Sequence, residues 1–219
     1  MMEMFTVLAV DGGAGTGKST LSKLISSRKN FLYVETGSHY RALTFILLEK
    51  ALNAESVEDY LTKNPLIIES NINKNKSEIQ IDGIRFNSED LRSTKVNENV
   101  SHFAAIPLLR KSLFDYQRSQ VNQAQSLGFS GVILEGRDIG TKILPDADLK
   151  IFLHADAETR IQRRMKDGEV DSIKKRDELD SKRKSAPLAC ADDALRINTA
   201  DHSAEEVYNL VIAALNSRL

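Results

Sequence analysis

A glycine-rich segment with a lysine and three hydroxyl residues follows the first apolar run of the chain, Thr6–Val10. The segment reads Gly12, Gly13, Ala14, Gly15, Thr16, Gly17, Lys18, Ser19, Thr20. It fits G-x-x-x-x-G-K-[ST], a phosphate-binding loop between a strand and a helix. Backbone N–H groups in such a loop surround phosphate oxygens, and the helix that follows adds its positive N-terminal end. We expect Lys18 to reach the β- and γ-phosphates of a nucleoside triphosphate, and Ser19 to ligate Mg²⁺.

The motif alone leaves the reaction open, because kinases, hydrolases and switches all use it. The simplest alternative, without phosphate binding, is a glycine-rich turn with an isolated lysine. That alternative does not account for the strand-like and helix-like segments on either side. The sequence therefore predicts a nucleotide-binding protein.

Arginines are grouped at three further places. Arg41 opens a helix-like segment, and Arg137 and Asp138 directly follow a buried strand, where open α/β sheets bind ligands. The stretch from Arg160 to Lys184 holds ten Lys/Arg and six Asp/Glu, a local charge of +4 on a chain of net charge −1. The simplest alternative for this charged stretch is a solvent-exposed helix face without a functional role. Within it, however, the spacing puts Arg176, Asp180 and Arg183 on one helical face. Arginine donates in a planar fork that suits phosphate, so these positions favour phosphate binding.

Composition and charge exclude several classes of protein. With 219 residues, 41% of them hydrophobic and 28% charged, the chain is typical of a globular protein with a well-buried core. No overall basic excess points to a nucleic-acid polymer. The lone Cys190 excludes an internal disulfide framework, and the four histidines lack metal-ligand spacing. Neither a secretory signal nor a membrane-spanning run is evident, so we expect a cytoplasmic protein without a membrane partner.

The elements that must position these residues alternate between strand and helix. We expect strands at Thr6–Val10, Leu32–Val34, Gly131–Leu134, Leu149–Leu153 and Ala194–Ile197. We expect helices at Gly17–Arg28, His39–Leu52 with Ser38 as its N-cap, Glu55–Lys63, Ser93–Leu127 with a break before Pro107, Glu158–Lys184 with a break at Asp167-Gly168, and from Ser203. Repeated alternation predicts an α/β fold, a parallel sheet flanked by helices on both faces.

The region from Leu66 to Arg92 departs from that alternation. Ile79–Ile81 and Ile84–Phe86 flank Asp82-Gly83, a strong signal for a tight hairpin. We interpret the region as an antiparallel insert, separate from the main sheet.

Taken in order, these segments resemble the bacterial type of cytidylate kinase, a nucleoside monophosphate kinase. The resemblance rests on the phosphate loop, Glu35-Thr36-Gly37-Ser38-His39-Tyr40-Arg41, Glu135-Gly136-Arg137-Asp138-Ile139-Gly140-Thr141, Pro145-Asp146-Ala147-Asp148, Arg176-Asp177-x-x-Asp180-x-x-Arg183 and Ala186-Pro187-Leu188. It runs from about Val7 to the C-terminal helix. It implies one P-loop kinase unit over 1–219, with a substrate-binding part at about 38–104 that carries the insert (66–92), and a helical lid at about 158–185.

The resemblance also implies roles for individual residues. ATP with Mg²⁺ would bind the phosphate loop, and the transferring phosphoryl group would meet Lys18, Arg137, Arg176 and Arg183. CMP, and dCMP with it, would meet Thr36, Arg41, Ser101, Arg110, Arg137, Asp138, Arg176 and Asp180. The family further implies a monomer that acts on small molecules.

Recognition of cytosine by Arg110 and Asp138 is chemically coherent. A carboxylate accepts from the N4 amine, while a guanidinium donates to N3 or O2. Uracil reverses the polarity at positions 3 and 4, which leaves buried groups unpaired. The bland alternatives are a surface arginine at Arg110 and a helix-interior serine at Ser101.

The chain departs from the family pattern at three places. The linker from Arg164 to Lys175 is short, Asn198 stands where aspartate is frequent, and Gly13 stands where proline is frequent. These departures concern the adenine side and the lid. None removes a residue expected to hold phosphate or cytosine.

Two other functions remain open at this point. The first is a nucleotide-dependent switch or regulatory ATPase that shares only the phosphate loop. Against it, Asn73-Lys74-Asn75-Lys76 lacks the aspartate that reads guanine in switch proteins, and the arginines would have no role. The second is a kinase with another acceptor, either a different nucleotide or a small metabolite such as shikimate.

Overall fold

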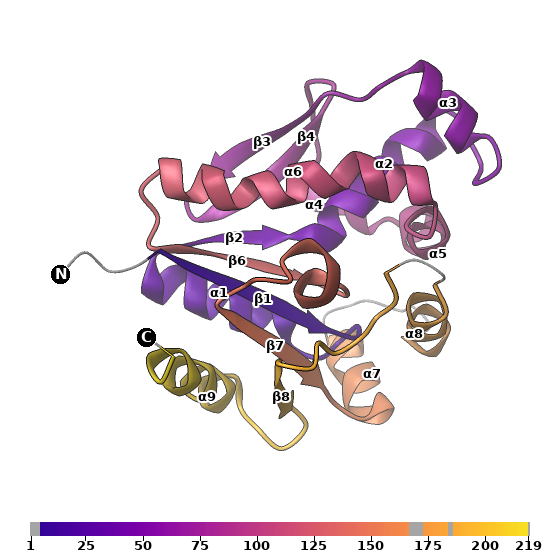
Figure 1. Ribbon diagram of the computed structural model, residues 1–219. Coiled ribbons are helices and arrows are strands. Elements are labelled where there is room, and N and C mark those ends of the chain that lie inside the picture. Colours follow the sequence, from indigo (N-terminus) through magenta and orange to yellow (C-terminus); the bar gives the residue numbers. More distant parts are fainter. Residues whose placement is uncertain (1–4, 167–172, 184–185, 219) are drawn as a thin grey trace.

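The strands form a mostly parallel sheet at the centre of the molecule (Figure 1). The computed structural model describes residues 5–166, 173–183 and 186–218, and of 173–176 only the backbone. The strands are β1 (Thr6–Gly12), β2 (Phe31–Glu35), β3 (Ile68–Asn73), β4 (Lys76–Ile81), β5 (Ile84–Arg85), β6 (Gly131–Gly136), β7 (Leu149–His154) and β8 (Leu195–Asn198). Their order is β3-β4-β2-β6-β1-β7-β8, and β5 pairs with β4.

Helices cover both faces of this sheet, as the alternation predicts. They are α1 (Lys18–Lys29), α2 (Thr36–Glu49), α3 (Val57–Lys63), α4 (Ser88–Arg92), α5 (Thr94–Phe103), α6 (Pro107–Ser126), α7 (Ala157–Lys166), α8 (Ile173–Ser181) and α9 (Ala204–Asn216), with one π-helical turn, η1 (Ile139–Ile143). In Figure 1, α1 and α9 lie on one side of the sheet and α6 on the other.

Side chains alternate across the central strands, which builds a core on each face. Leu8 and Val10 of β1 pack with α1 and α9 in one cluster. Ala9, between them, packs with Leu134 and Ala124 in the cluster on the other face. Strands buried on both faces read as continuous apolar runs, which explains why their positions could be predicted.

A third cluster supports the part of the molecule that follows β2. It joins α2, α3, α5 and α6 to β4 through residues such as Leu43, Val57, Ile81, Phe103 and Leu113. Helix α2 begins at the residue after the end of β2, so the chain passes from the sheet into this cluster without a loop. The predicted break before Pro107 is confirmed, with α5 ending at Phe103 and α6 beginning at the proline.

The antiparallel segment extends the main sheet, so its interpretation as a separate insert is wrong. The predicted turn at Asp82-Gly83 is confirmed: both residues have positive φ (50° and 78°), and β4 pairs antiparallel with β5. However, β4 also pairs parallel with β2 through Tyr33–Lys76 and Val34–Ser77. The unpredicted β3 then pairs antiparallel with β4. An exposed edge of β2 offers unpaired backbone groups, and β4 satisfies them.

The start of α2 also differs from the prediction. The helix begins at Thr36 with Glu35 at the N-cap, so Ser38 lies in the first turn and is not the cap. Its hydroxyl donates to Glu35 O at 2.6 Å. The predicted break at Asp167-Gly168 lies outside the described residues. The last helix begins where it was expected: Ser203 and Glu206 form a capping box that begins α9.

Candidate functional site

The phosphate loop joins β1 to α1 with its backbone folded closely around its own side chains. Gly12 has φ 153°, and a Cβ there would lie 2.3 Å from Leu153 O, so only glycine fits. Lys18 is buried, and its Nζ donates to Gly13 O at 2.7 Å. Thr16 Oγ1 donates to the same carbonyl at 3.0 Å. The lysine is thus held over the loop, in position for phosphate oxygens.

Glu135 is a functional candidate that the sequence interpretation did not assign. It lies near the end of β6, next to β1, and its Oε1 accepts from Ser19 Oγ at 2.6 Å and from Tyr33 Oη at 3.1 Å. Its Oε2 is buried with no partner among the described residues. Burial raises the pKa of Glu135, and the neighbouring Glu35 adds to this. The sequence pattern that could have identified Glu135 is an acidic residue at the end of a buried strand that neighbours the phosphate loop.

The donor set around Ser19 suits Mg²⁺. A hydroxyl and a carboxylate are hard oxygen ligands, and Mg²⁺ in nucleotide sites takes few protein ligands besides substrate phosphates and water. Among the described residues, no group of three or more His, Cys, Asp or Glu could hold a metal alone.

Arg110 and Asp138, the two residues expected to read the base, form a buried ion pair. Arg110 on α6 donates through Nη2 to Asp138 Oδ2, and through Nη1 to Ala104 O at 3.3 Å. The Tyr40 ring lies 5.3 Å from the guanidinium carbon. Since Arg110 is buried, the interpretation of it as a surface residue is excluded. Burial raises the pKa of Asp138, while Arg110 opposes that shift.

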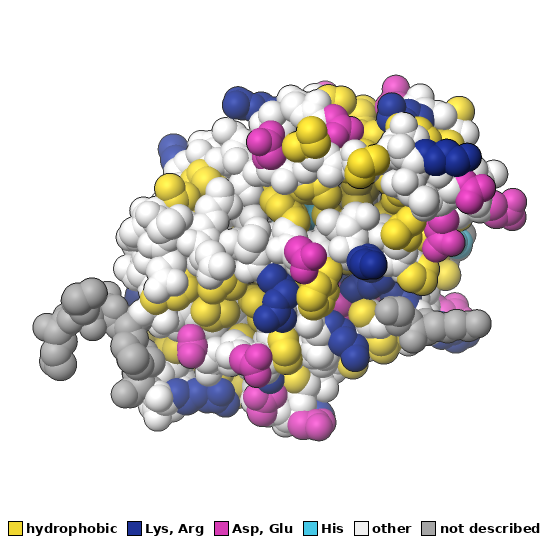
Figure 2. Space-filling model, turned by 45° about the horizontal axis from the view of Figure 1, so that its top comes forward, with side chains coloured by type: hydrophobic (Ala, Val, Ile, Leu, Met, Phe, Trp, Pro, Cys, Tyr) yellow, Lys and Arg dark blue, Asp and Glu magenta, His cyan; other side chains and the backbone are white. Residues whose placement is uncertain are grey.

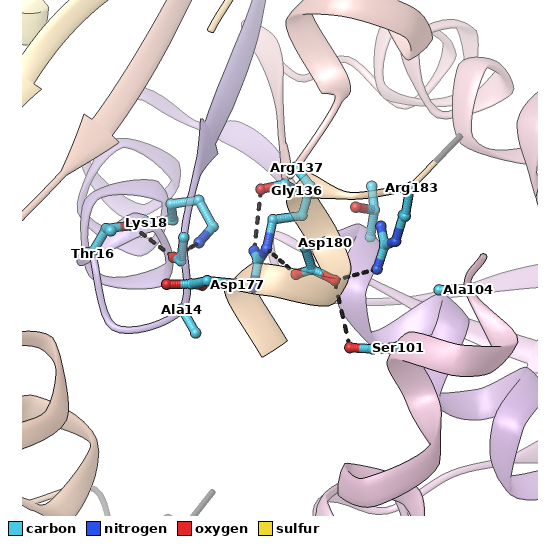
Figure 3. Close-up of polar contacts among 12 residues, drawn as sticks. Ala14, Thr16, Lys18, Ser101, Ala104, Gly136, Arg137, Asp177, Asp180 and Arg183 are labelled. Atoms are coloured by element: carbon cyan, nitrogen blue, oxygen red, sulfur yellow. Dashed lines mark hydrogen bonds and ion pairs between the residues drawn. The ribbon is translucent and has the colours of Figure 1, made fainter. Parts of the chain in front are cut away.

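Asp180 is the centre of a second charged cluster. Figure 3 shows it between Arg137 on one side and Arg183 and Ser101 on the other. Its Oδ2 accepts from Arg137 Nε at 2.9 Å, and its Oδ1 accepts from Arg183 Nη2 and from Ser101 Oγ at 3.5 Å. Ser101 therefore contacts the charged cluster, which an ordinary helix-interior serine would not do. The cluster joins four residues that are far apart in sequence: Ser101 of α5, Arg137 directly after β6, Asp180 of α8 and Arg183 after α8.

The remaining predicted residues lie nearby with other contacts. Thr36 Oγ1 donates to Glu135 O at 2.7 Å. Arg41 Nη1 donates to Leu91 O and Asn97 Oδ1, each at 2.7 Å, which ties it to the α4–α5 junction. Arg176 lies on α8, but its side chain is outside the described residues.

One cleft brings the phosphate loop and these clusters together. It has a volume of about 830 Å³. From the loop it is lined by residues that include Gly15 and Lys18, and from the opposite wall by Arg41, Arg137, Asp138 and Arg183. Further cations at its rim include Arg92 and Arg164. Cationic groups on both walls suit a ligand that carries phosphates at its centre.

Helices α7 and α8 pack over the phosphate loop. Arg160 on α7 pairs with Asp177 on α8 and donates through Nη1 to Ala14 O at 3.3 Å. A Cβ at Gly13 would lie 2.9 Å from Arg160 Nη1, so glycine at this departure from the family pattern leaves room for the arginine. Arg160 was not singled out from the sequence, because one arginine in a charged helix carries no distinguishing signal.

The segment after β8 also reaches the loop. Thr199 Oγ1 donates to Thr16 O at 3.1 Å, and Arg163 on α7 donates to Thr199 Oγ1 and O at 2.9 and 2.6 Å. Asn198, the second departure, bonds Asp201 at 3.0 Å. The loop is therefore enclosed by α7, α8 and this segment.

The fold and the cleft define a P-loop phosphotransferase: a parallel sheet, a loop for the donor's phosphates, and arginines on the facing wall. Comparison with known proteins gives the family. The family model described as cytidylate kinase matches residues 8–217. The chain belongs to the cytidylate kinase family.

Curated relatives match over nearly their whole length. A cytidylate kinase of Alkaliphilus oremlandii is 40% identical over 226 residues, with 96% of this chain and 98% of the relative covered. One from Fusobacterium nucleatum is 37% identical over 220 residues, with 94% of each covered. A solved structure, a deoxyadenosine kinase from M. mycoides, matches with a TM-score of 0.48 and 14% identity, covering 97% of this chain and 100% of that one.

Proposed function

We propose that the chain transfers the γ-phosphoryl group of ATP to CMP and to dCMP, with Mg²⁺ accompanying ATP. The observation that carries this proposal is the buried Arg110–Asp138 pair, whose Asp138 lines the same cleft as the phosphate loop. A carboxylate beside a guanidinium presents an acceptor and donors side by side, as the cytosine edge requires. A switch or regulatory ATPase would have no use for such a pair, and shikimate has no base to read.

The chemistry needs no strong general base, because the acceptor phosphate is already an anion. The protein then acts by positioning the two phosphates and by stabilising charge in the transition state. Lys18 would serve the donor phosphates, and Arg137, Arg183, Arg41 and Arg176 the acceptor and transferring groups. When bound, Mg²⁺ would neutralise charge on the donor phosphates, held at Ser19 with Glu135 behind it.

Asp180 gives Arg137 and Arg183 a fixed starting position. Burial lowers the pKa of Arg183, and the adjacent Asp180 carboxylate opposes that shift. A guanidinium held by a carboxylate is already desolvated in part and oriented, so less rearrangement is needed when a phosphate enters.

We propose that the segment at about 158–185 is a lid, and that about 38–104 is the substrate-binding part. The contact of Arg160 with Ala14 of the phosphate loop supports the first assignment, as does that of Arg163 with Thr199, which itself bonds Thr16 of the loop. The placement of Arg41 and Ser101 in the lining of the cleft supports the second. A lid that closes only over both substrates excludes water, which limits wasteful hydrolysis of ATP.

We also propose a cytoplasmic monomer. Large exposed hydrophobic residues are scattered along the described chain at Ile67, Ile84, Phe114, Leu127, Met165 and Leu210. On the face shown in Figure 2, basic and acidic side chains are interspersed, as suits small-molecule substrates better than a nucleic-acid polymer. No helix in the described part of the chain is long and apolar enough to cross a bilayer.

A coupled assay of ADP release tests the proposal. The acceptors are CMP, dCMP, UMP, AMP and none, with ATP and Mg²⁺ throughout. We expect rapid release with CMP and dCMP, weak release with UMP, and little with AMP or without acceptor. Release that is equally fast without acceptor would identify an ATPase, and equal rates with CMP and UMP at low concentration would exclude the proposed base recognition.

A further inference from the structure

A buried carboxylate outside the cleft connects the two halves of the site. Asp11 lies near the end of β1, directly before Gly12 of the glycine loop, and it is 4% exposed. Its Oδ1 accepts from Ile139 N at 2.8 Å and its Oδ2 from Gly140 N at 2.7 Å. Both carboxylate oxygens are thus committed to two successive backbone N–H groups. Asp11 is not among the described residues that line the cleft.

The two N–H groups belong to the first residues of the helical turn that follows Arg137 and Asp138, which are expected to bind the acceptor nucleotide. The π-helical turn η1 starts at Ile139, directly after Arg137 and Asp138. Its own backbone bonds run from Lys142, Ile143 and Leu144 back to Asp138 and Ile139, so they leave the first N–H groups of the turn unused. The first N–H groups of any helical segment need partners from outside, and here Asp11 supplies them.

The surroundings show that this carboxylate is kept in place despite its burial. Burial raises its pKa to about 6, while the two backbone N–H groups oppose that shift. Of the charged groups around it, Asp138 raises the pKa and Lys18 on α1 lowers it. Lys150 on β7 passes its alkyl chain by Gly140 and directs its Nζ to Asp193 at 2.9 Å. A buried carboxylate that accepts two N–H groups holds its partners firmly, because leaving any of them unpaired is costly.

We propose that Asp11 is a positioning residue that sets the specificity for cytosine. It fixes the turn after Asp138 to the strand that carries the phosphate loop, and so holds the Asp138 carboxylate in register with the donor phosphates. This inference rests on the proposed function, because it assumes that Asp138 reads the base. Asp11 is assigned this role without a place in the lining of the cleft, so it acts through Asp138.

The test compares Asp11→Asn with wild type. The amide keeps the shape of the carboxylate but turns a donor toward one of the two N–H groups, so one bond is lost. A hydrogen bond to a charged group corresponds to about tenfold or more in an equilibrium constant. We expect the KM for CMP to rise about tenfold and the preference for CMP over UMP to fall by a similar factor. The KM for ATP should stay within about twofold of wild type, because the bonds of the phosphate loop are not altered.

Asp148→Asn is the matched control. Asp148 is exposed and accepts from Val7 N at 2.7 Å, so it also holds a backbone N–H of β1, at the far end of that strand. Its variant should match wild type in all three quantities. Equal changes in both KM values for Asp11→Asn would mark a purely structural role, and no change in either would overturn the proposal. Failure of wild type to use CMP would instead refute the proposed function.

A second measurement needs no variant. In wild type, the amides of Ile139 and Gly140 should exchange slowly with solvent. Addition of CMP alone should slow them further, since base binding at Asp138 and the bonds to Asp11 stabilise the same turn. Exchange as fast as that of exposed amides, or exchange that CMP leaves unchanged, would contradict the proposal.

Discussion

At the scale of residues, the proposed recognition of the base rests on Arg110 and Asp138. Each is buried, and each is neutralised by the other, so a base must replace or join that pairing with matched donors and acceptors. A mismatch leaves a buried polar group without a partner, which is where large discrimination comes from.

Asp138→Asn should therefore change which base is accepted. An amide offers a donor as well as an acceptor, so it no longer opposes uracil. We expect kcat/KM for CMP to fall about 10- to 100-fold and that for UMP to fall much less. Steady-state kinetics with both acceptors measures this. The control, Asp115→Asn, changes an exposed carboxylate on the same helix as Arg110 and should leave both values unchanged. An equal loss for CMP and UMP would show that Asp138 does not read the base.

His39 makes stability depend on pH independently of the site. It is fully buried against Tyr116, with ring centroids 5.1 Å apart, and neither ring nitrogen has a partner among the described residues. Burial lowers its pKa from 6.5 to about 3. The folded state therefore holds His39 neutral, while the unfolded state takes up a proton below pH 6.5. The stability associated with neutral His39 is present above pH 6.5 and is lost as the pH falls toward 3.

His39→Phe should remove this dependence. Between pH 7.5 and pH 5, wild type should lose about 2 kcal/mol of unfolding free energy relative to the variant, from the difference between solution and folded pKa values. Urea unfolding followed by circular dichroism at both pH values measures it. Asp11 contributes with the opposite sign, because its pKa is raised to about 6, but it is present in both proteins and cancels. Parallel pH curves for the two proteins would refute the prediction.

At the scale of elements, local sequence patterns predicted what local interactions determine. The apolar runs of β1, β6 and β7, the break at Pro107 and the turn at Asp82-Gly83 were all found from neighbouring residues. The pairing of β4 with β2 was missed because it depends on two residue pairs more than forty positions apart in sequence. The turn η1 was missed for a similar reason, since the remote Asp11 supplies its first bonds.

The candidate site divides in the same way, into residues that the sequence indicated and residues whose roles depend on remote contacts. The phosphate loop and the resemblance led to most of its residues, and the structure brings Ser101, Arg137, Asp180 and Arg183 into contact. Glu135 and Arg160 were missed because their roles arise from what they touch: the Ser19 hydroxyl and the carbonyl of Ala14. An acidic or basic residue has no local signature for such contacts.

The lid assignment leads to a prediction for α7 and α8. In the part of the chain that the structure describes, polar contacts join these helices to the phosphate loop and to the residues after β6, among them Arg160 with Ala14 O and Asp180 with Arg137. Elements held by few contacts open readily, and a ligand that bridges the two sides closes them. CMP together with a non-hydrolysable ATP analogue should slow amide exchange in both helices more than either nucleotide alone. An unchanged pattern would exclude the lid.

Arg183→Ala tests the same element through kinetics. If Arg183 acts mainly in the closed state, its loss should lower kcat more than it raises the KM for ATP. Lys182→Ala is the control, because Lys182 is exposed and pairs only with the exposed Glu178 in the contacts described. A defect confined to KM would mark Arg183 as a residue that binds the ground state.

The sheet and two helices, α2 and α6, connect the three hydrophobic clusters of the molecule. The cluster around α2, α3 and α5 is distinct from the clusters on the two faces of the central strands. Yet α2 continues from β2, and α6 contributes Leu113 to that cluster and Ala124 to the cluster on one face of the sheet. Gln120 of α6 also accepts from Ser77 Oγ on β4 at 2.6 Å.

These connections predict that the antiparallel strands and the parallel core unfold together. If β3 and β4 formed a separate insert, they would open at a lower free energy than β1, whose neighbours on both sides are buried strands. Because β4 completes the sheet beside β2 and is covered by α6, its opening should expose the core that α6 shares. Native-state amide exchange should give β4 and β1 similar opening free energies, and urea unfolding should follow one transition by circular dichroism and by tyrosine fluorescence. Gln120→Ala should lower the midpoint without splitting the transition, whereas Ser126→Ala, at the exposed end of the same helix, should leave it in place. Two transitions, or β4 amides that exchange far more readily than those of β1, would show that the strands after α3 form an independent unit.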